Sequence, residues 1–307
     1  MVRNSKILVA GGSGFIGANL IKVLISSGNK VISISKNKNV KNRKIEGVKY
    51  IYHDLRKPLS EEKYTLLSDI KYVVNCSGYI DHTDFSNGGK IIFNDHFESI
   101  INLTNIAMNL KVNSFIHIGS SDEYGENNSP ISESARESPI SPYALAKLTS
   151  THYLQLCYRQ KILNTIVIRP FLVFGEGQNK NRFLPYLIDN CINNREFKVT
   201  KGAQIRDYLY VKDFNLALLK AFNNEKAFGE VINIASGIPI SIKEIIECVK
   251  EITGKGKPNY GAIDYRPGES MRLYADITKA KEILKWEPKF NFKNSLKKVI
   301  NWYKYNE

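Results

Sequence analysis

Cysteine is scarce in this 307-residue sequence, and long apolar runs are missing altogether. Four widely separated cysteines with no paired spacing predict neither a disulfide framework nor a metal site: Cys76, Cys157, Cys191 and Cys248. No run approaches the roughly 20 apolar residues of a transmembrane helix. The first six residues lead straight into an apolar strand, without the pattern of a signal peptide. We therefore expect a cytoplasmic protein with no membrane partner.

Acidic residues are also in deficit, since 30 Asp and Glu face 44 Lys and Arg, for a formal charge of +14. Such a charge fits either a nucleic-acid-binding protein or an enzyme that binds anionic small molecules. Many lysines stand beside Asn or Ile, which indicates compositional bias, so we favour the enzyme and expect no nucleic-acid partner. Hydrophobic content of 43% and a length of 307 residues indicate a globular protein with one large α/β domain and a smaller lobe.

The most informative stretch is the glycine-rich turn at residues 11–17, Gly-Gly-Ser-Gly-Phe-Ile-Gly. It follows an apolar run at residues 7–10 and opens a helical pattern that includes Leu20 and Leu24. Strand, glycine turn and helix together are the context of a dinucleotide-binding loop, in which helix N–H groups face a pyrophosphate. We expect the cofactor to contact Gly11, Gly14, Phe15, Ile16 and Gly17.

The next strand, residues 30–35, lacks the carboxylate that binds the ribose 2′-hydroxyl in NAD-specific sites. Ser35 and Lys36 stand there instead. A hydroxyl and a cation suit a 2′-phosphate, which a carboxylate would repel. The sequence therefore favours NADP(H), with NAD(H) as the alternative.

Four further apolar runs, at residues 48–52, 72–76, 115–118 and 165–168, alternate with helical patterns. Uniformly apolar strands of this kind predict a doubly wound parallel sheet. Asp54 either accepts the adenine amino group or caps a turn. Small residues at Cys76, Ser77 and Gly78 would let the cofactor approach the backbone.

A serine, a tyrosine and a lysine form the candidate catalytic group. Ser120 follows the strand at 115–118, and ligands bind beyond the carboxyl ends of such strands. Ser141 and Pro142 are good residues to begin a helix, which places Tyr143 and Lys147 one turn apart on the same face. A lysine at this distance favours the phenolate, so we expect it to lower the tyrosine pKa.

These residues together resemble the extended short-chain dehydrogenase/reductases, the NAD-dependent epimerase/dehydratase family, in the branch that modifies nucleotide-linked sugars. The segments at 75–78, 169–175, 204–213 and 266–269 match as well. The resemblance implies a Rossmann domain over 1–174, with 208–237 returning to it, and a smaller α/β lobe over 175–307. It also implies a nucleotide-diphosphate sugar as substrate and a homodimer built through a four-helix bundle.

The same resemblance implies roles for individual residues. Ser120, Tyr143 and Lys147 would be catalytic, while Leu55, Lys147 and Arg169 would join the cofactor site. The substrate would be bound by Ser121, Asp122, Tyr143, Arg182, Arg206 and Arg266. Guanidinium groups suit the diphosphate because they form bidentate contacts with phosphate.

The reaction is the least determined part. Dehydratases of this family carry an Asp-Glu pair after the catalytic hydroxyl, whereas Ser121 and Asp122 stand here, so the glutamate is absent or displaced to Glu123. Epimerases usually hold NAD, which Ser35 and Lys36 do not favour. We therefore predict NADPH-dependent reduction of a 4-keto-6-deoxy nucleotide sugar. A 4-epimerase is the first alternative, a 4,6-dehydratase a weaker one and a non-catalytic nucleotide-binding or nucleic-acid-binding protein a remote one.

Overall fold

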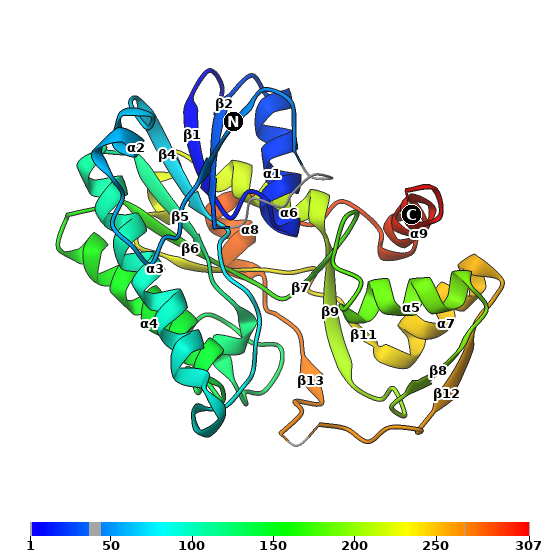
Figure 1. Cartoon of the computed structure of the whole chain (residues 1–307). Coiled ribbons are helices and arrows are strands. Elements are labelled where there is room, and N and C mark those ends of the chain that lie inside the picture. Colours follow the sequence, from blue (N-terminus) through cyan, green and yellow to red (C-terminus); the bar gives the residue numbers. More distant parts are fainter. Residues whose placement is uncertain (1, 37–43, 267, 307) are drawn as a thin grey trace.

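The computed structural model describes residues 2–36, 44–266 and 268–306, which fold into a larger and a smaller lobe (Figure 1). The larger lobe contains a seven-stranded sheet with the order β10-β6-β5-β4-β1-β2-β3, and every pair in it is parallel. The strands are β1 (Lys6–Ala10), β2 (Lys30–Ser35), β3 (Val48–Tyr52), β4 (Ile70–Asn75), β5 (Ser114–Ile118), β6 (Thr165–Pro170) and β10 (Val231–Ile234). The predicted doubly wound α/β fold is confirmed.

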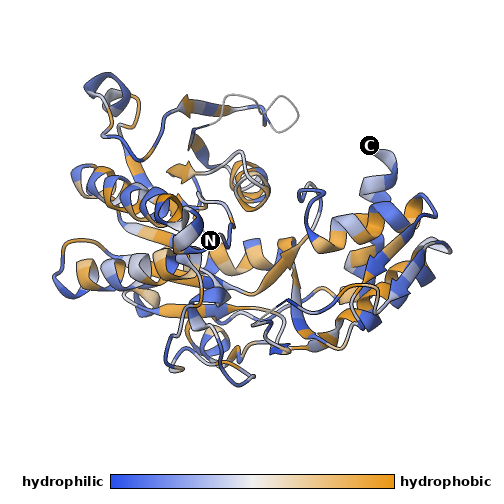
Figure 2. Cartoon of the chain, turned by 60° about the horizontal axis from the view of Figure 1, so that its bottom comes forward, coloured by the Kyte–Doolittle hydropathy of each residue, from blue (hydrophilic) through white to orange (hydrophobic). Residues whose placement is uncertain are grey.

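Helices cover both faces of this sheet. Alternate strand residues point to opposite faces, so Ile7 and Val9 pack with one set of helices while Leu8 packs with the other. The first set comprises α1 (Phe15–Ser26), α6 (Val211–Ala221) and α8 (Thr278–Leu284). The second comprises α3 (Gly89–Asn109) and α4 (Pro142–Arg159), with the short α2 (Glu61–Thr65) nearby. The helices show mixed hydrophobic and hydrophilic residues along their length (Figure 2).

The smaller lobe is organised around β9 (Ile205–Tyr210), which pairs with three short strands, β7 (Leu172–Phe174), β11 (Pro239–Ser241) and β13 (Arg272–Leu273). Helices α5 (Phe183–Ile192), α7 (Ile242–Thr253) and α9 (Phe292–Tyr305) share one apolar core beside it. Strands β8 (Glu196–Val199) and β12 (Lys257–Tyr260) form a separate pair. Because β7 pairs with β9, the small sheet begins at Leu172, ahead of the boundary predicted after residue 174.

Two carboxylates of the segment 204–213, Asp207 and Asp213, bind backbone N–H groups of chain segments that are distant in the sequence. Asp207 accepts hydrogen bonds from the backbone N–H groups of Ser236, Gly237 and Ala275, and burial raises its pKa. Asp213 accepts two backbone N–H groups of the segment that precedes α9. Buried acceptors of this kind fix chain segments rather than bind substrate. No helix in the described part of the chain is long and apolar enough to span a membrane.

Candidate active site

The glycine-rich turn joins β1 to α1 at the carboxyl edge of the large sheet. Gly11 has a φ of +73°, and a Cβ there would lie 2.7 Å from the backbone of Cys76 and Ser77. A Cβ on Gly17 would lie 2.4 Å from the Gly11 carbonyl oxygen, so both positions require glycine. No side chain caps the start of α1 at Gly14, which leaves the positive end of the helix available to an anion. This turn fits a dinucleotide pyrophosphate.

The end of β2 carries the residues on which the prediction of NADP(H) depended. The Ser35 hydroxyl oxygen is buried, and among the described residues it has no hydrogen-bond partner. Lys36 is exposed, with its Nζ 3.7 Å from Asp54 Oδ2. Arg56 Nε lies 2.9 Å from the same aspartate and holds its pKa well below the ordinary range. Lys36 is therefore not an isolated cation. Leu55, which stands between Asp54 and Arg56 in the sequence, is buried.

The segment after β4, residues 76–78, contacts both the glycine-rich turn and the lysine of the candidate catalytic helix. Burial raises the pKa of the Cys76 thiol to about 12, so this cysteine remains neutral. The Ser77 N–H donates to Asn75 Oδ1 at 3.0 Å. Gly78 has a φ of +128°, and a Cβ there would lie 2.7 Å from the His96 ring and 3.7 Å from Lys147 Nζ. The backbone at Gly78 thus adjoins the lysine of the candidate catalytic group.

Ser120, Tyr143 and Lys147 converge at the end of β5. Helix α4 begins at Pro142, with Ser141 Oγ accepting the Ala144 N–H at 3.1 Å. Tyr143 and Lys147 are 4% and 5% exposed. The Ser120 hydroxyl is close enough to the Tyr143 side chain to lower the Tyr143 pKa, and Lys147 Nζ donates to the Ile118 carbonyl at 2.8 Å. The structure therefore brings the predicted catalytic residues together.

The charges around Tyr143 act against the expected effect of the lysine. Burial, followed by the nearby Asp122 carboxylate, raises the Tyr143 pKa above 10, and the Ser120 hydroxyl opposes this only in part. The predicted lowering of this pKa by Lys147 is therefore not observed. Burial lowers the pKa of Lys147 itself to about 8, against the attraction of Glu123. At neutral pH the tyrosine is protonated and the lysine is mostly charged, an arrangement that suits proton donation.

Two histidines and two charged residues also lie near the tyrosine: His82, His96, Asp122 and Arg182. The His82 ring meets the Tyr143 ring edge-on at 5.8 Å, and His82 Nε2 lies 3.8 Å from Asp122 Oδ2. Burial raises the pKa of Asp122, whereas the positive charge of Arg182 lowers it. Arg182 stands at the start of α5, so the smaller lobe contributes charge to the site. The sequence predicted the loop at residues 79–90, which contains His82, as a sugar-contact region, but no motif gave His82 a specific role.

Arg169 and Glu123 form an ion pair in the protein interior. Arg169 is fully buried, its Nε 2.8 Å from Glu123 Oε2 and its NH2 group 3.0 Å from Glu137 Oε1. Arg169 is therefore a buried residue paired with carboxylates, and its contact with the cofactor stays a prediction. Glu123 is equally buried, so it cannot serve as the displaced proton-abstracting glutamate. Ser121 is buried as well.

The other two arginines lie in the smaller lobe. Arg206 pairs with Glu269 at 2.5 Å and is largely buried. Arg266 is exposed.

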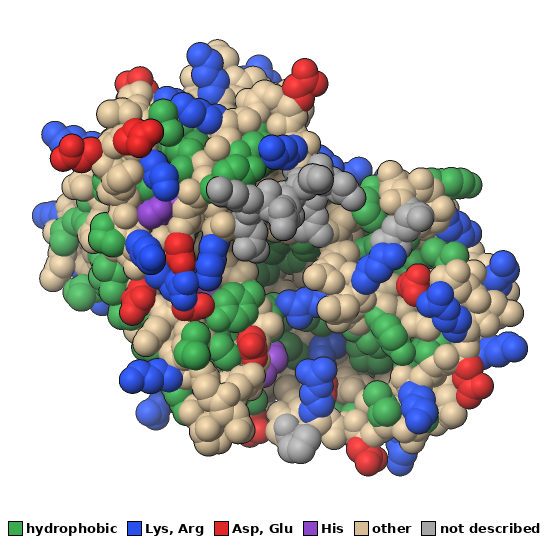
Figure 3. Space-filling view, in the orientation of Figure 1, with side chains coloured by type: hydrophobic (Ala, Val, Ile, Leu, Met, Phe, Trp, Pro, Cys, Tyr) green, Lys and Arg blue, Asp and Glu red, His purple; other side chains and the backbone are tan. Residues whose placement is uncertain are grey.

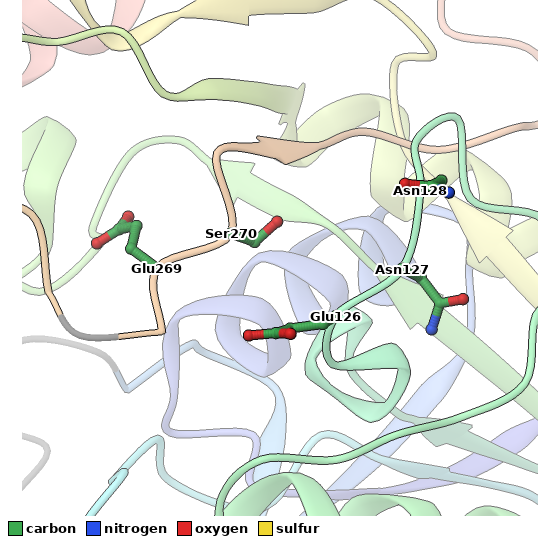
Figure 4. A pocket seen from close by; sticks show the side chains of 5 residues that line it. All are labelled: Glu126, Asn127, Asn128, Glu269 and Ser270. Carbon is green, nitrogen blue, oxygen red and sulfur yellow. The ribbon is translucent and has the colours of Figure 1, made fainter.

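A pocket of about 440 Å³ adjoins Glu269, between the loop after β5 and the segment before β13 (Figure 4). It is lined by Glu126, Asn127, Asn128, Glu269 and Ser270. The surface is hollowed between the lobes, with basic side chains on both sides (Figure 3). Among the described residues, no cluster of three or more His, Cys, Asp or Glu could hold a metal ion.

Comparison with known proteins gives matches over the whole chain. A family model described as "NAD dependent epimerase/dehydratase family" matches residues 7–235. The protein named "Putative UDP-glucose 4-epimerase" of Methanocaldococcus jannaschii is 30% identical, over 98% of this chain and 99% of that protein. The structure of UDP-glucose 4-epimerase from Thermotoga maritima with UDP-glucose matches with a TM-score of 0.90 and 27% identity, over 98% and 99% of the two chains. UDP-glucuronic acid 4-epimerase from Bacillus cereus, with UDP-glucuronic acid and NAD, matches with a TM-score of 0.88 and 26% identity, over 98% and 100%.

Proposed function

The chain belongs to the NAD dependent epimerase/dehydratase family, and we propose that within this family it is a nucleotide-sugar 4-epimerase. The observation that carries the proposal is the convergence of Ser120, Tyr143 and Lys147 at the end of β5, where Lys147 adjoins Gly78. Its position in a chain that is similar to 4-epimerases along its full length supports that reaction. The burial of Glu123 removes one candidate base for dehydration.

In this proposal Tyr143 moves a proton at the sugar O4 atom. A nicotinamide dinucleotide held at the glycine-rich turn would supply reversible hydride transfer at the sugar C4 atom. Tyr143 takes the O4 proton in the first half and donates it back in the second, while Ser120 orients the same oxygen. Burial and the Asp122 carboxylate oppose the phenolate that the first half requires, so the Ser120 hydroxyl and the positive charge of Arg182, which lower the Tyr143 pKa, matter most there.

We propose NAD as the resident cofactor. The preference for NADP(H) depended on Ser35 and a free cation at Lys36, but Lys36 lies 3.7 Å from Asp54. The Ser35 hydroxyl is neutral, so it offers no charge to a 2′-phosphate. A reductase that consumes NADPH is the second candidate function, and the missing carboxylate at the end of β2 favours it.

A UDP-sugar is the proposed substrate, since the epimerases to which this chain is similar are solved with UDP-glucose and UDP-glucuronic acid. Arg206 and Arg266 would face its diphosphate from the smaller lobe. We also propose a homodimer through α3 and α4, which pack against each other and expose Ile91 (64%) and Leu156 (44%). Light scattering would measure its mass.

Incubation with UDP-glucose, UDP-N-acetylglucosamine and UDP-glucuronic acid, followed by NMR of the sugar C4 position, tests the proposal. We expect the C4 epimer of at least one sugar, no net change in absorbance at 340 nm, and NAD released on denaturation. The Tyr143→Phe variant is the control. Consumption of NADPH with a 4-keto-6-deoxy nucleotide sugar, and no epimer from any of the three, would establish the reductase instead.

A further inference from the structure

A single buried carboxylate connects the elements that carry the catalytic group. Glu123 Oε1 accepts the backbone N–H of Ser120 at 2.8 Å. Glu123 Oε2 accepts the hydroxyl of Thr151 at 2.7 Å and Arg169 Nε at 2.8 Å. Ser120 follows β5, Thr151 belongs to α4, and Arg169 belongs to β6. Each oxygen of this carboxylate is thus used by groups from the core of the site.

The hydrogen bond between Glu123 and Thr151 lies on α4 one turn away from Lys147. Thr151 lies one helical turn after Lys147 on the same face, and both are buried. Gly119 leaves the space that the carboxylate occupies, because a Cβ there would lie 2.5 Å from Glu123 Oε1. Glu123 therefore fixes the catalytic serine relative to the helix that carries Tyr143 and Lys147.

The local charges also leave Glu123 only partly neutralised by Arg169. The Arg169 guanidinium lies 2.7 Å from Glu123 and 3.0 Å from Glu137, so one positive charge serves two carboxylates. The net negative charge that remains favours the protonated amine of Lys147, whose burial opposes it. The negative charges of Glu123 and Glu137 are then matched by the positive charges of Arg169 and Lys147.

We propose that Glu123 is a positioning residue, which holds Ser120 against helix α4 and keeps Lys147 charged during turnover. The proposal deepens the proposed function, because it concerns the same catalytic group. Glu123 acts through Ser120 and Lys147 and does not itself touch the substrate.

The pH dependence of Lys147 tests this role. The groups that act on it are Glu123 and Cys76, together with His96 on α3 and His117 on β5. Burial and Lys147 lower the pKa of both histidines, to about 4 for His96, so they are neutral at pH 7 and above. Cys76 is likewise neutral, which leaves Glu123 as the negative charge acting on the amine at neutral pH.

The test compares Glu123→Gln with a control, Glu137→Gln. Both variants lose a carboxylate that pairs with Arg169, but Glu123 also accepts hydrogen bonds from Ser120 and Thr151. We expect Glu123→Gln to lower kcat at least tenfold with KM within twofold. The alkaline limb of its kcat profile should move to lower pH by about one unit. Glu137→Gln should keep kcat within twofold and leave the limb in place.

A double variant, Glu123→Met with Arg169→Met, guards against misfolding, since replacing a buried ion pair by apolar residues is often neutral for stability. We expect it to fold and still to show the lower kcat. Wild-type kcat and an unmoved limb in a folded Glu123 variant would overturn the proposal, as would equal losses in Glu137→Gln.

If the proposed function is wrong, the wild-type protein will epimerise no sugar, and kcat cannot be measured. In that case the affinity for NADH is measured between pH 7 and 10, since Lys147 is expected to bind the nicotinamide ribose. The alkaline half-point of binding should lie about one pH unit lower in Glu123→Gln than in wild type. An identical half-point in the two proteins would refute the role of Glu123.

Discussion

Replacing Lys147 by methionine should make the protein more stable and inactive at the same time. The ammonium group is buried, and its burial lowers its pKa from 10.5 to about 8. Each pKa unit corresponds to about 1.4 kcal/mol, so keeping this lysine charged at pH 7 costs roughly 3 kcal/mol of folding free energy. Methionine removes that cost but leaves the Ile118 carbonyl without its donor, which costs about 1 kcal/mol.

The sign of the pH dependence follows from proton binding. Between pH 8 and 10.5 the unfolded chain binds more protons at Lys147 than the folded protein does, so wild-type stability rises with pH across that window. The methionine variant lacks this contribution. Its advantage of about 2 kcal/mol at pH 7 should therefore disappear by about pH 10.

Urea unfolding of both proteins at pH 7 and pH 10, without added cofactor, measures the difference. The matched control is Lys22→Met, because Lys22 is exposed on α1. This control should show no pH-dependent difference from wild type. A Lys147→Met protein that is less stable than wild type at pH 7, or whose difference from wild type is the same at both pH values, would refute the reasoning.

Three further outcomes follow from the site. Tyr143→Phe should lower kcat roughly a hundredfold or more with little change in NAD affinity by titration, since a general acid–base group contributes on this scale. Arg206→Ala should raise the KM for the nucleotide sugar about tenfold with kcat nearly unchanged, as expected for a lost phosphate contact of about 1.4 kcal/mol. Gly17→Ala should abolish copurified dinucleotide, measured by absorbance after denaturation, because its Cβ would lie 2.4 Å from the Gly11 carbonyl oxygen.

The sheet and the glycine-rich turn could be predicted because local sequence determines them. Residues 7–10 and 30–35 are apolar enough to be buried on both faces, and the turn between them requires glycine for its φ and close contacts. The helix at Tyr143 was predictable for a similar reason, since Ser141 and Pro142 begin it. In each case the pattern that predicts the element lies within a few residues along the chain, although Gly11 also meets the distant backbone of Cys76 and Ser77.

Long-range contacts explain what could not be predicted. Arg169 resembles a ligand-binding arginine in sequence, and only its contacts with Glu123 and Glu137, 46 and 32 residues away, show that it is a core residue. The salt bridge between Lys36 and Asp54 likewise depends on the pairing of β2 with β3. The rise in the Tyr143 pKa comes from burial, which helical spacing does not reveal.

The site also separates chemistry from substrate choice. The residues proposed for proton transfer follow β5 or lie on α4 of the larger lobe, and Glu123 contacts both of these segments. The arginines proposed to meet a nucleotide, Arg182 and Arg206, belong to the smaller lobe, and the pocket beside Glu269 is lined by residues of both lobes. Substitutions in the smaller lobe can therefore change which sugar is bound without disturbing the buried charges around Lys147. The sugar is accordingly determined by contacts that the catalytic motifs do not encode.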